Sequence, residues 1–361
     1  MLTNKNSISA WQTGILIFFL FFANKILVLP SLFVEQAGIL SFILPIFMFL
    51  FEFGLLFLFF KVKKRFPTQT FREIVETMLG KFCFYFLSTL IMLFFLGKAI
   101  LLYDVTYVFF TKTVYQDGTN LMFLFCFIPI MIHLALSNLR AVGRTAQLFF
   151  PLVVLIVLFC LVVGVFGIES FPLFSGFSAK QMAMCALRHS MVFGDSMFLF
   201  VIIDKINIKK GQWKILFSLA TASAVCVCLI FLVFVLLFTY TSFMHPFALF
   251  EIISYIKEVG GVGRIDIISM IVIVILTYFH LGIFLISFKE SFVSMFKIDA
   301  KYSIVLFFAI FLVVIEYLIV NLQKAIFFGE HFWPFFNGVS YGVLPLFFII
   351  CLIKSKRRKI E

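Results

Sequence analysis

Two short polar stretches interrupt otherwise apolar segments: Ala23-Asn24-Lys25 in the first long apolar run and Phe193-Gly194-Asp195-Ser196 in the sixth. Hydrocarbon cannot hydrogen-bond exposed backbone or solvate a charge, so breaks at membrane depth persist only where they are buried in protein or line a cavity. Broken spans at corresponding positions of two halves point to the substrate site of a transporter-type fold. The sequence therefore predicts a ligand site where these two stretches meet.

Composition indicates an integral membrane protein. Of the 361 residues, 63% are hydrophobic and only 13% charged, which leaves too little polar surface for a soluble protein of this length. The net charge of +12 does not indicate nucleic-acid binding, because the basic residues form short clusters between apolar runs. We also expect no enzymatic activity, cofactor or metal, since no nucleophile elbow, phosphate loop or HExxH motif is present and the seven cysteines lack metal-ligand spacing.

The apolar runs predict ten membrane-spanning helices, because one span needs about 20 apolar residues. They lie at about 11–34, 39–60, 82–110, 120–137, 147–168, 182–204, 214–240, 264–288, 303–322 and 335–353. Five spans per half is an odd number, so the second half enters the membrane from the opposite side, as an inverted repeat requires. We expect one all-α polytopic domain over 1–361, with repeats at about 10–168 and 182–353 and a basic tail at 354–361.

Two further segments are amphipathic and too short to span. Residues 68–81 and 247–259 place apolar side chains at helical spacing with charges opposite them. The first is expected to be a helix at the inner interface, with Thr68 as a possible cap, and the second a helix on the outer face. Both are interpreted as structural connectors, with a partner-docking surface as the alternative.

Charged side chains inside the spans are the candidate functional residues, because each needs a partner or water at membrane depth. Lys25 and Asp195 stand out because each falls at a helix break, where unpaired amides and carbonyls already form a site for ions or zwitterions. A purely structural Lys25–Asp195 pair is the main alternative. Glu52 and Lys98 lie in the middle of their spans. For each, an internal ion pair that sets helix packing and a role in substrate binding are equally good interpretations. Snorkelling to an interface accounts for the charges nearer span ends, namely Asp104, Arg188, Asp204 and Glu316.

Several motifs resemble those of the spore germination receptor B subunits (the GerAB type), a family of the amino acid–polyamine–organocation transporter superfamily. The run 26–30 (ILVLP) followed by 35–38 (EQAG) resembles the first-span signature of that family. Further matches follow in order and at comparable spacing: 140–144 (RAVGR), 149–151 (FFP), Pro172 with Gly176, 193–195 (FGD, similar to FGE) and 263–266 (GRID, similar to ERxD).

The chain also departs from that pattern at the first break. Ala23-Asn24 stands where the family usually has Gly-Thr or Gly-Ser, and Lys25 follows unexpectedly. In the eighth span, His280 aligns where the family often has a lysine. Relative to the family pattern, the lysine therefore lies in span one instead of span eight, and this difference would change ligand preference. The alternative for His280 is a neutral histidine hydrogen-bonded within its helix bundle.

The resemblance implies a LeuT-like fold, in which broken spans one and six enclose a midplane pocket that spans three and eight complete. The candidate ligand-binding residues are Ala23, Asn24, Lys25, Lys98, Phe193, Gly194, Asp195, Ser196, Thr277 and His280. The implied function is a germinant receptor B subunit that senses a small nutrient, commonly an amino acid, in the lipid of the inner spore membrane. It would act with receptor A and C subunits. A proton-coupled permease of amino acids or amines is the alternative, and a membrane scaffold with a vestigial pocket is a third.

The distribution of basic residues predicts the orientation of the chain. With the ten spans above, twenty-one Lys and Arg residues fall on one side of the membrane and five on the other. Loops rich in Lys and Arg stay cytoplasmic, so both termini are expected inside.

A topology reporter should therefore read cytoplasmic when fused after Phe60 or at the C-terminus, and external when inserted near Asp117-Gly118. Activity of paired reporters that work on only one side of the membrane checks this. An inverted result at any of these positions would rule out the two-repeat arrangement.

Overall fold

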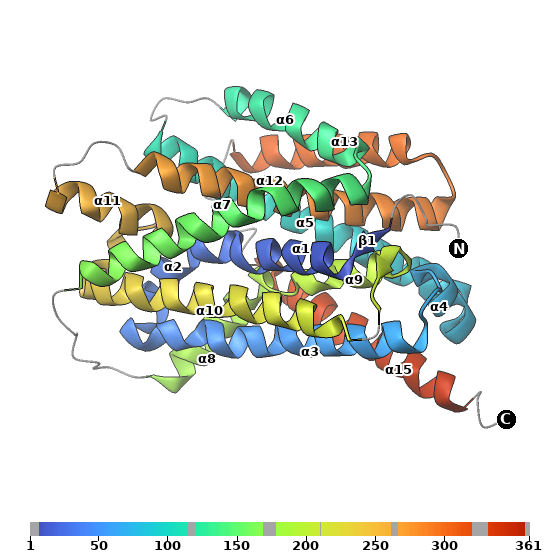
Figure 1. Ribbon diagram of the computed structural model, residues 1–361. Helices are drawn as coiled ribbons and strands as arrows, with labels where there is room; N and C mark the ends of the chain where they lie inside the picture. Colours follow the sequence, from blue (N-terminus) through green and yellow to red (C-terminus); the bar gives the residue numbers. More distant parts are fainter. Residues whose placement is uncertain are drawn as a thin grey trace.

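The computed structural model describes residues 7–114, 120–168, 178–209, 211–260, 266–319 and 331–357, which form a bundle of long helices lying side by side (Figure 1). The first half contains α1 (Ala10–Phe22), α2 (Leu29–Ala37), α3 (Leu44–Arg65), α4 (Phe71–Leu79), α5 (Lys81–Thr113), α6 (Asn120–Leu136) and α7 (Leu139–Phe166). The second contains α8 (Ala179–His189), α9 (Phe198–Val201), α10 (Trp213–Phe238), α11 (Ala248–Gly260), α12 (Asp266–Phe296), α13 (Ala300–Ile319), a helix at 331–337 and α15 (Leu344–Arg357).

Short elements join or interrupt these helices. They are the 3₁₀ turns η1 (Asn24–Ile26), η2 (Ile39–Ile43), η3 (Ser190–Val192), η4 (Asp195–Met197), η5 (Ile203–Lys205) and η6 (Thr239–Met244), and the π-helical turn η7 (Gly338–Val343). Strands β1 (Ile8–Ser9) and β2 (Ile206–Asn207) pair in parallel. This pairing ties the start of the first predicted span to the end of the sixth.

The structure confirms an all-α protein of membrane type. Among the described residues, six helices are long and apolar enough to cross a membrane, and a seventh span results if the bent pair α1–α2 is counted as one. Helices α6 and α13 are apolar but shorter in their described parts, and the sixth predicted span is divided among α8, η3, η4 and α9. The ten-span repeat therefore stays a prediction.

The first predicted break is present between α1 and α2. Helix α1 begins with a capping box between Ser9 and Gln12 and ends at Phe22, with Ala23 as its C-cap, and the chain bends by 50° before α2. Pro30 lies in the first turn of α2, where a backbone N–H would have no intrahelical acceptor, so its missing N–H costs α2 no hydrogen bond. The same missing N–H prevents the upstream helix from continuing through this position. The bend therefore follows from the sequence around this proline.

The second predicted break is present between α8 and α9. Phe193 is extended and Gly194 has φ +82°, a left-handed conformation that favours glycine. A Cβ atom at this position would also lie 2.6 Å from Cβ of Ser340 in η7. Gly194 therefore both turns the chain and permits the close approach of η7.

The two amphipathic segments form helices α4 and α11, as predicted. The cap of α4 is Thr70 rather than Thr68. Its hydroxyl accepts a hydrogen bond from the Glu73 N–H, and the Glu73 carboxylate accepts one from the Thr70 N–H. This reciprocal capping box requires a spacing of three residues, which Thr70 and Glu73 have.

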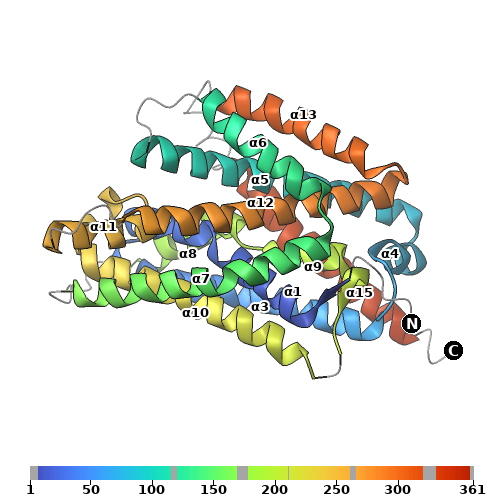
Figure 2. The ribbon, with the colours of Figure 1, turned by 45° about the horizontal axis from the view of Figure 1, so that its top comes forward.

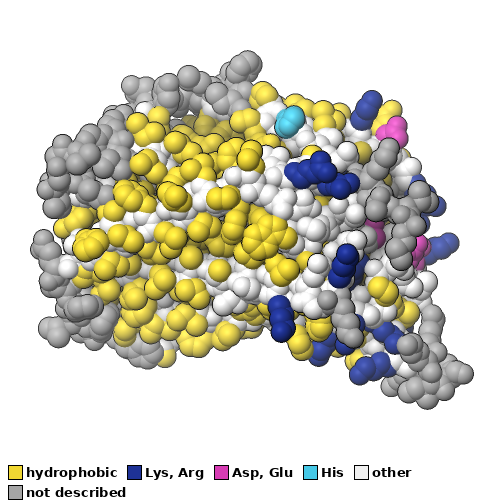
Figure 3. Space-filling view, in the orientation of Figure 1, with side chains coloured by type: hydrophobic (Ala, Val, Ile, Leu, Met, Phe, Trp, Pro, Cys, Tyr) yellow, Lys and Arg dark blue, Asp and Glu magenta, His cyan; other side chains and the backbone are white. Residues whose placement is uncertain are grey.

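Helix α1 lies at the centre of the bundle, packed against α10, α7 and α12 (Figure 2). Its residues from Thr13 to Phe22 are almost completely buried. A helix that is apolar on all sides is expected to be buried in this way. The face shown in Figure 3 is largely apolar, while Lys and Arg gather near the end where α4 and α15 lie. This distribution agrees with the predicted loop asymmetry.

Candidate functional site

The two helix breaks meet at a buried ion pair. The ammonium group of Lys25, in η1, lies 2.5 Å from Oδ2 of Asp195, in η4, and both side chains are fully buried. The same ammonium donates a hydrogen bond to the carbonyl oxygen of Leu20, at 2.9 Å. Lys25 therefore also satisfies a carbonyl in the last turn of α1, where no intrahelical donor is available.

A second lysine binds the other carboxylate oxygen of Asp195. Lys98, from the middle of α5, forms an ion pair with Oδ1 and donates to the carbonyl oxygen of Phe193. On the remaining side, Nε2 of His280, from α12, lies 3.5 Å from Oδ2. Asp195 thus joins η4 to η1 and α5, and it lies next to α12.

Glu52, from α3, occupies the start of the sixth-span half-helix. Its carboxylate accepts hydrogen bonds from the N–H groups of Gly194, at 2.5 Å, and Asp195, at 3.1 Å. It also accepts from the N–H and the hydroxyl of Ser196, at 3.4 and 2.5 Å. A carboxylate at this position satisfies the unpaired N–H groups that begin a helix and interacts favourably with its dipole.

The four charges balance one another, two ammonium groups against two carboxylates. Burial of a charge is tolerated only when it is paired and hydrogen-bonded, and this cluster meets that condition. The chain's own Lys25 and Glu52 therefore fill the carbonyl-rich and amide-rich helix ends that in transporter-type sites are open to substrate and ions.

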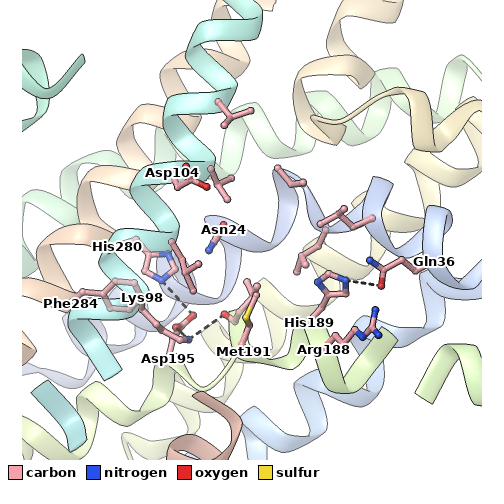
Figure 4. A pocket seen from close by; sticks show the side chains of 17 residues that line it. Asn24, Gln36, Lys98, Asp104, Arg188, His189, Met191, Asp195, His280 and Phe284 are labelled. Atoms are coloured by element: carbon pink, nitrogen blue, oxygen red, sulfur yellow. Dashed lines mark hydrogen bonds and ion pairs between the residues drawn. The ribbon is translucent and has the colours of Figure 1, made fainter. Parts of the chain in front are cut away.

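A cavity of about 310 Å³ adjoins the cluster (Figure 4). It is lined by Asn24, Val28, Leu29, Leu32, Gln36, Lys98, Leu101, Asp104, Val105, Val108, Arg188, His189, Met191, Val192, Asp195, His280 and Phe284. Ligand pockets of small molecules occupy about 300–1,000 Å³ and are mostly apolar with a few polar groups, so this cavity suits a small ligand.

The structure brings the predicted site residues together but gives them different positions. Those that line the cavity are Asn24, Lys98, Asp195 and His280. The others lie around or beneath it without lining it: Ala23, Lys25, Phe193, Gly194, Ser196 and Thr277. Phe193 is buried with its ring 5.0 Å from the ammonium of Lys25, and Thr277 is buried one turn before His280 on α12.

Several cavity residues were not among the predicted ligand-binding residues. Asp104 and Arg188 were interpreted as snorkelling, and Gln36 and His189, whose side chains are 3.0 Å apart, were not singled out. The charges of Asp104 and Arg188 within spans were the available signal, but distance from a span end does not show which way a side chain points. Motif residues Pro172 and Gly176, and 263–265, lie outside the described residues.

These features define an all-α integral membrane protein with a small-molecule-sized cavity beside a buried charge cluster at two helix breaks. The chain belongs to the spore germination protein family, whose family model matches residues 7–324. The resemblance inferred from the motifs is thereby confirmed. A comparison with curated proteins found no match.

Replacing Asp195 with Asn should reduce the amount of folded protein in the membrane more than replacing Lys25 with Ala. Asp195→Asn removes the direct ion-pair partner of two buried lysines, whereas Lys25→Ala leaves Asp195 paired with Lys98. Breaking a buried pair by removing one partner costs about 3–5 kcal/mol. Membrane abundance and the thermal unfolding midpoint of the purified protein measure the effect.

The double variant should lose less than the sum of the two single variants, because the residues share one interaction. Lys112→Ala, which removes an exposed lysine near the end of α5, is the matched control and should change neither quantity. Normal abundance and unfolding of Asp195→Asn would contradict a structural role for the cluster.

Proposed function

We propose that this chain is the B subunit of a nutrient germinant receptor, which binds a small amino acid in the cavity and passes a conformational change to receptor A and C subunits. The observation that carries this proposal is the position of the cavity, which adjoins both helix breaks and their shared ion pair. Membership of the spore germination protein family supports the biological setting. The inner spore membrane is the expected location.

Segments from both broken spans line the cavity, so a bound ligand would contact both spans and could change how they lie relative to each other. Asn24 and Val28 come from the first break, Met191 and Val192 from the second, and Phe284 from α12. A ligand that contacts these segments better in one arrangement than in another shifts the population toward that arrangement. The protein would then signal without carrying the ligand across the membrane.

A ten-span LeuT-like arrangement of two inverted repeats is part of this proposal. Two features support it: breaks occur in the first and sixth predicted spans, and the α5 and α12 helices, predicted spans three and eight, contribute Lys98 and His280 beside them. With cytoplasmic termini, the cavity would open toward the outer side, because Asp104 and Val108 lie toward the Thr113 end of α5.

A proton-coupled permease is the second candidate, and His280 is the observation that favours it. Neither ring nitrogen of His280 makes a hydrogen bond among the described residues, although the ring is buried and one nitrogen lies 3.5 Å from Asp195. A histidine in this position could accept a proton as the site changes its access to water.

Binding and transport distinguish the two functions. The full-length chain in vesicles without partner subunits should bind an amino acid, measured by calorimetry, and should not accumulate the radiolabelled ligand when a pH gradient is imposed. In spores, deletion of the A-type subunit should abolish germination while binding to this chain persists. Proton-coupled accumulation by this chain alone would support the permease instead.

A further inference from the structure

The charged groups at the helix breaks are already paired within the protein. Asp195 is bound on both oxygens by lysines, and Glu52 accepts hydrogen bonds from three backbone N–H groups and a hydroxyl. A ligand ammonium that bound Asp195 would compete with Lys25 and Lys98 for one carboxylate and would add a third buried positive charge beside them. A second carboxylate in the cavity is therefore the better partner for the ligand's ammonium group.

Asp104 is the other acidic residue that lines the cavity. It lies six residues after Lys98 on α5, which is about 9 Å farther along the helix axis. Its side chain is half-buried, and no ion pair or hydrogen bond of Asp104 occurs in the described part of the chain. Figure 4 shows it on α5, away from the Lys98–Asp195 pair and facing the same pocket as Asn24.

The remaining lining suits an aliphatic amino acid. The cavity walls also carry Val28, Leu101 and Val105, which would pack against an apolar side chain. Arg188, from α8, also lines the cavity, is exposed, and has no ion pair among the described residues. Unlike Lys98, Arg188 is therefore not engaged by the charge cluster.

We propose that Asp104 binds the ammonium group of the ligand, in the part of the cavity away from the charge cluster. This assignment rests on the proposed function and names the specificity-determining residue of the same cavity. The charge cluster then supports the walls of the cavity, while Asp104 selects the ligand.

The test compares the full-length wild-type chain with Asp104→Asn in lipid nanodiscs. The probes are the common amino acids, and the tightest binder is then compared with its N-acetyl derivative, which lacks the ammonium charge. The wild type should bind the amino acid at least about tenfold more tightly than the derivative, as expected for loss of a charged hydrogen bond. Asp104→Asn should lose a similar factor for the amino acid and discriminate little between the two probes.

The ligand-free unfolding midpoint of Asp104→Asn should equal or exceed that of the wild type, because the substitution removes a half-buried charge that has no protein partner. This separates a binding role from a structural one. Glu35→Gln is the matched control, since Glu35 is exposed on α2 and does not line the cavity. It should leave affinity and discrimination unchanged.

Unchanged affinity and discrimination in Asp104→Asn, with normal binding by the wild type, would overturn the assignment of Asp104 and leave the proposed receptor function intact. A lowered unfolding midpoint without ligand would also overturn it, in favour of a structural role. Failure of the wild type to bind any amino acid would overturn the proposed function and this assignment together.

Discussion

The carboxylate of Asp195 is the group on which the centre of this protein depends. It follows a left-handed glycine in the sixth predicted span and receives Lys25 from the first span and Lys98 from α5, all buried. In a low-dielectric interior such charges are stable only together, because each alone would carry an uncompensated desolvation cost. The ion pairs therefore fix how the two broken spans, which have few backbone hydrogen bonds at their breaks, lie against the rest of the bundle.

Glu52 complements this arrangement from the opposite side. It binds the backbone of Gly194, Asp195 and Ser196, so the amide-rich end of the half-helix is filled by the protein itself, as Lys25 fills the carbonyl-rich end of α1. With both helix ends neutralised by the chain's own side chains, the site is electrically balanced before any ligand arrives. Selectivity is then expected to come from groups along the cavity wall rather than from the helix ends.

Local sequence signals predicted much of the fold. The polar stretches at 23–25 and 193–196 predicted the two breaks. The structure shows how the backbone makes them, with Pro30 in a first helical turn and Gly194 in a left-handed conformation. The amphipathic spacing of 71–79 and 248–260 likewise predicted α4 and α11. The cap of α4 was placed two residues early, because Thr68 and Thr70 have the same chemistry and only the spacing to Glu73 distinguishes them.

The sequence by itself determined the membrane class, the family and the positions of the two breaks, because composition, hydropathy and backbone preference are properties of short segments. Only the tertiary structure decided which charges meet. Lys98 and Glu52 join Asp195 across 97 and 143 residues respectively, and Asp104 lines the cavity. A side chain's partner depends on the rotation and packing of whole helices, and apolar helices such as α5, which carry little amphipathic signal, do not reveal that rotation in their sequence.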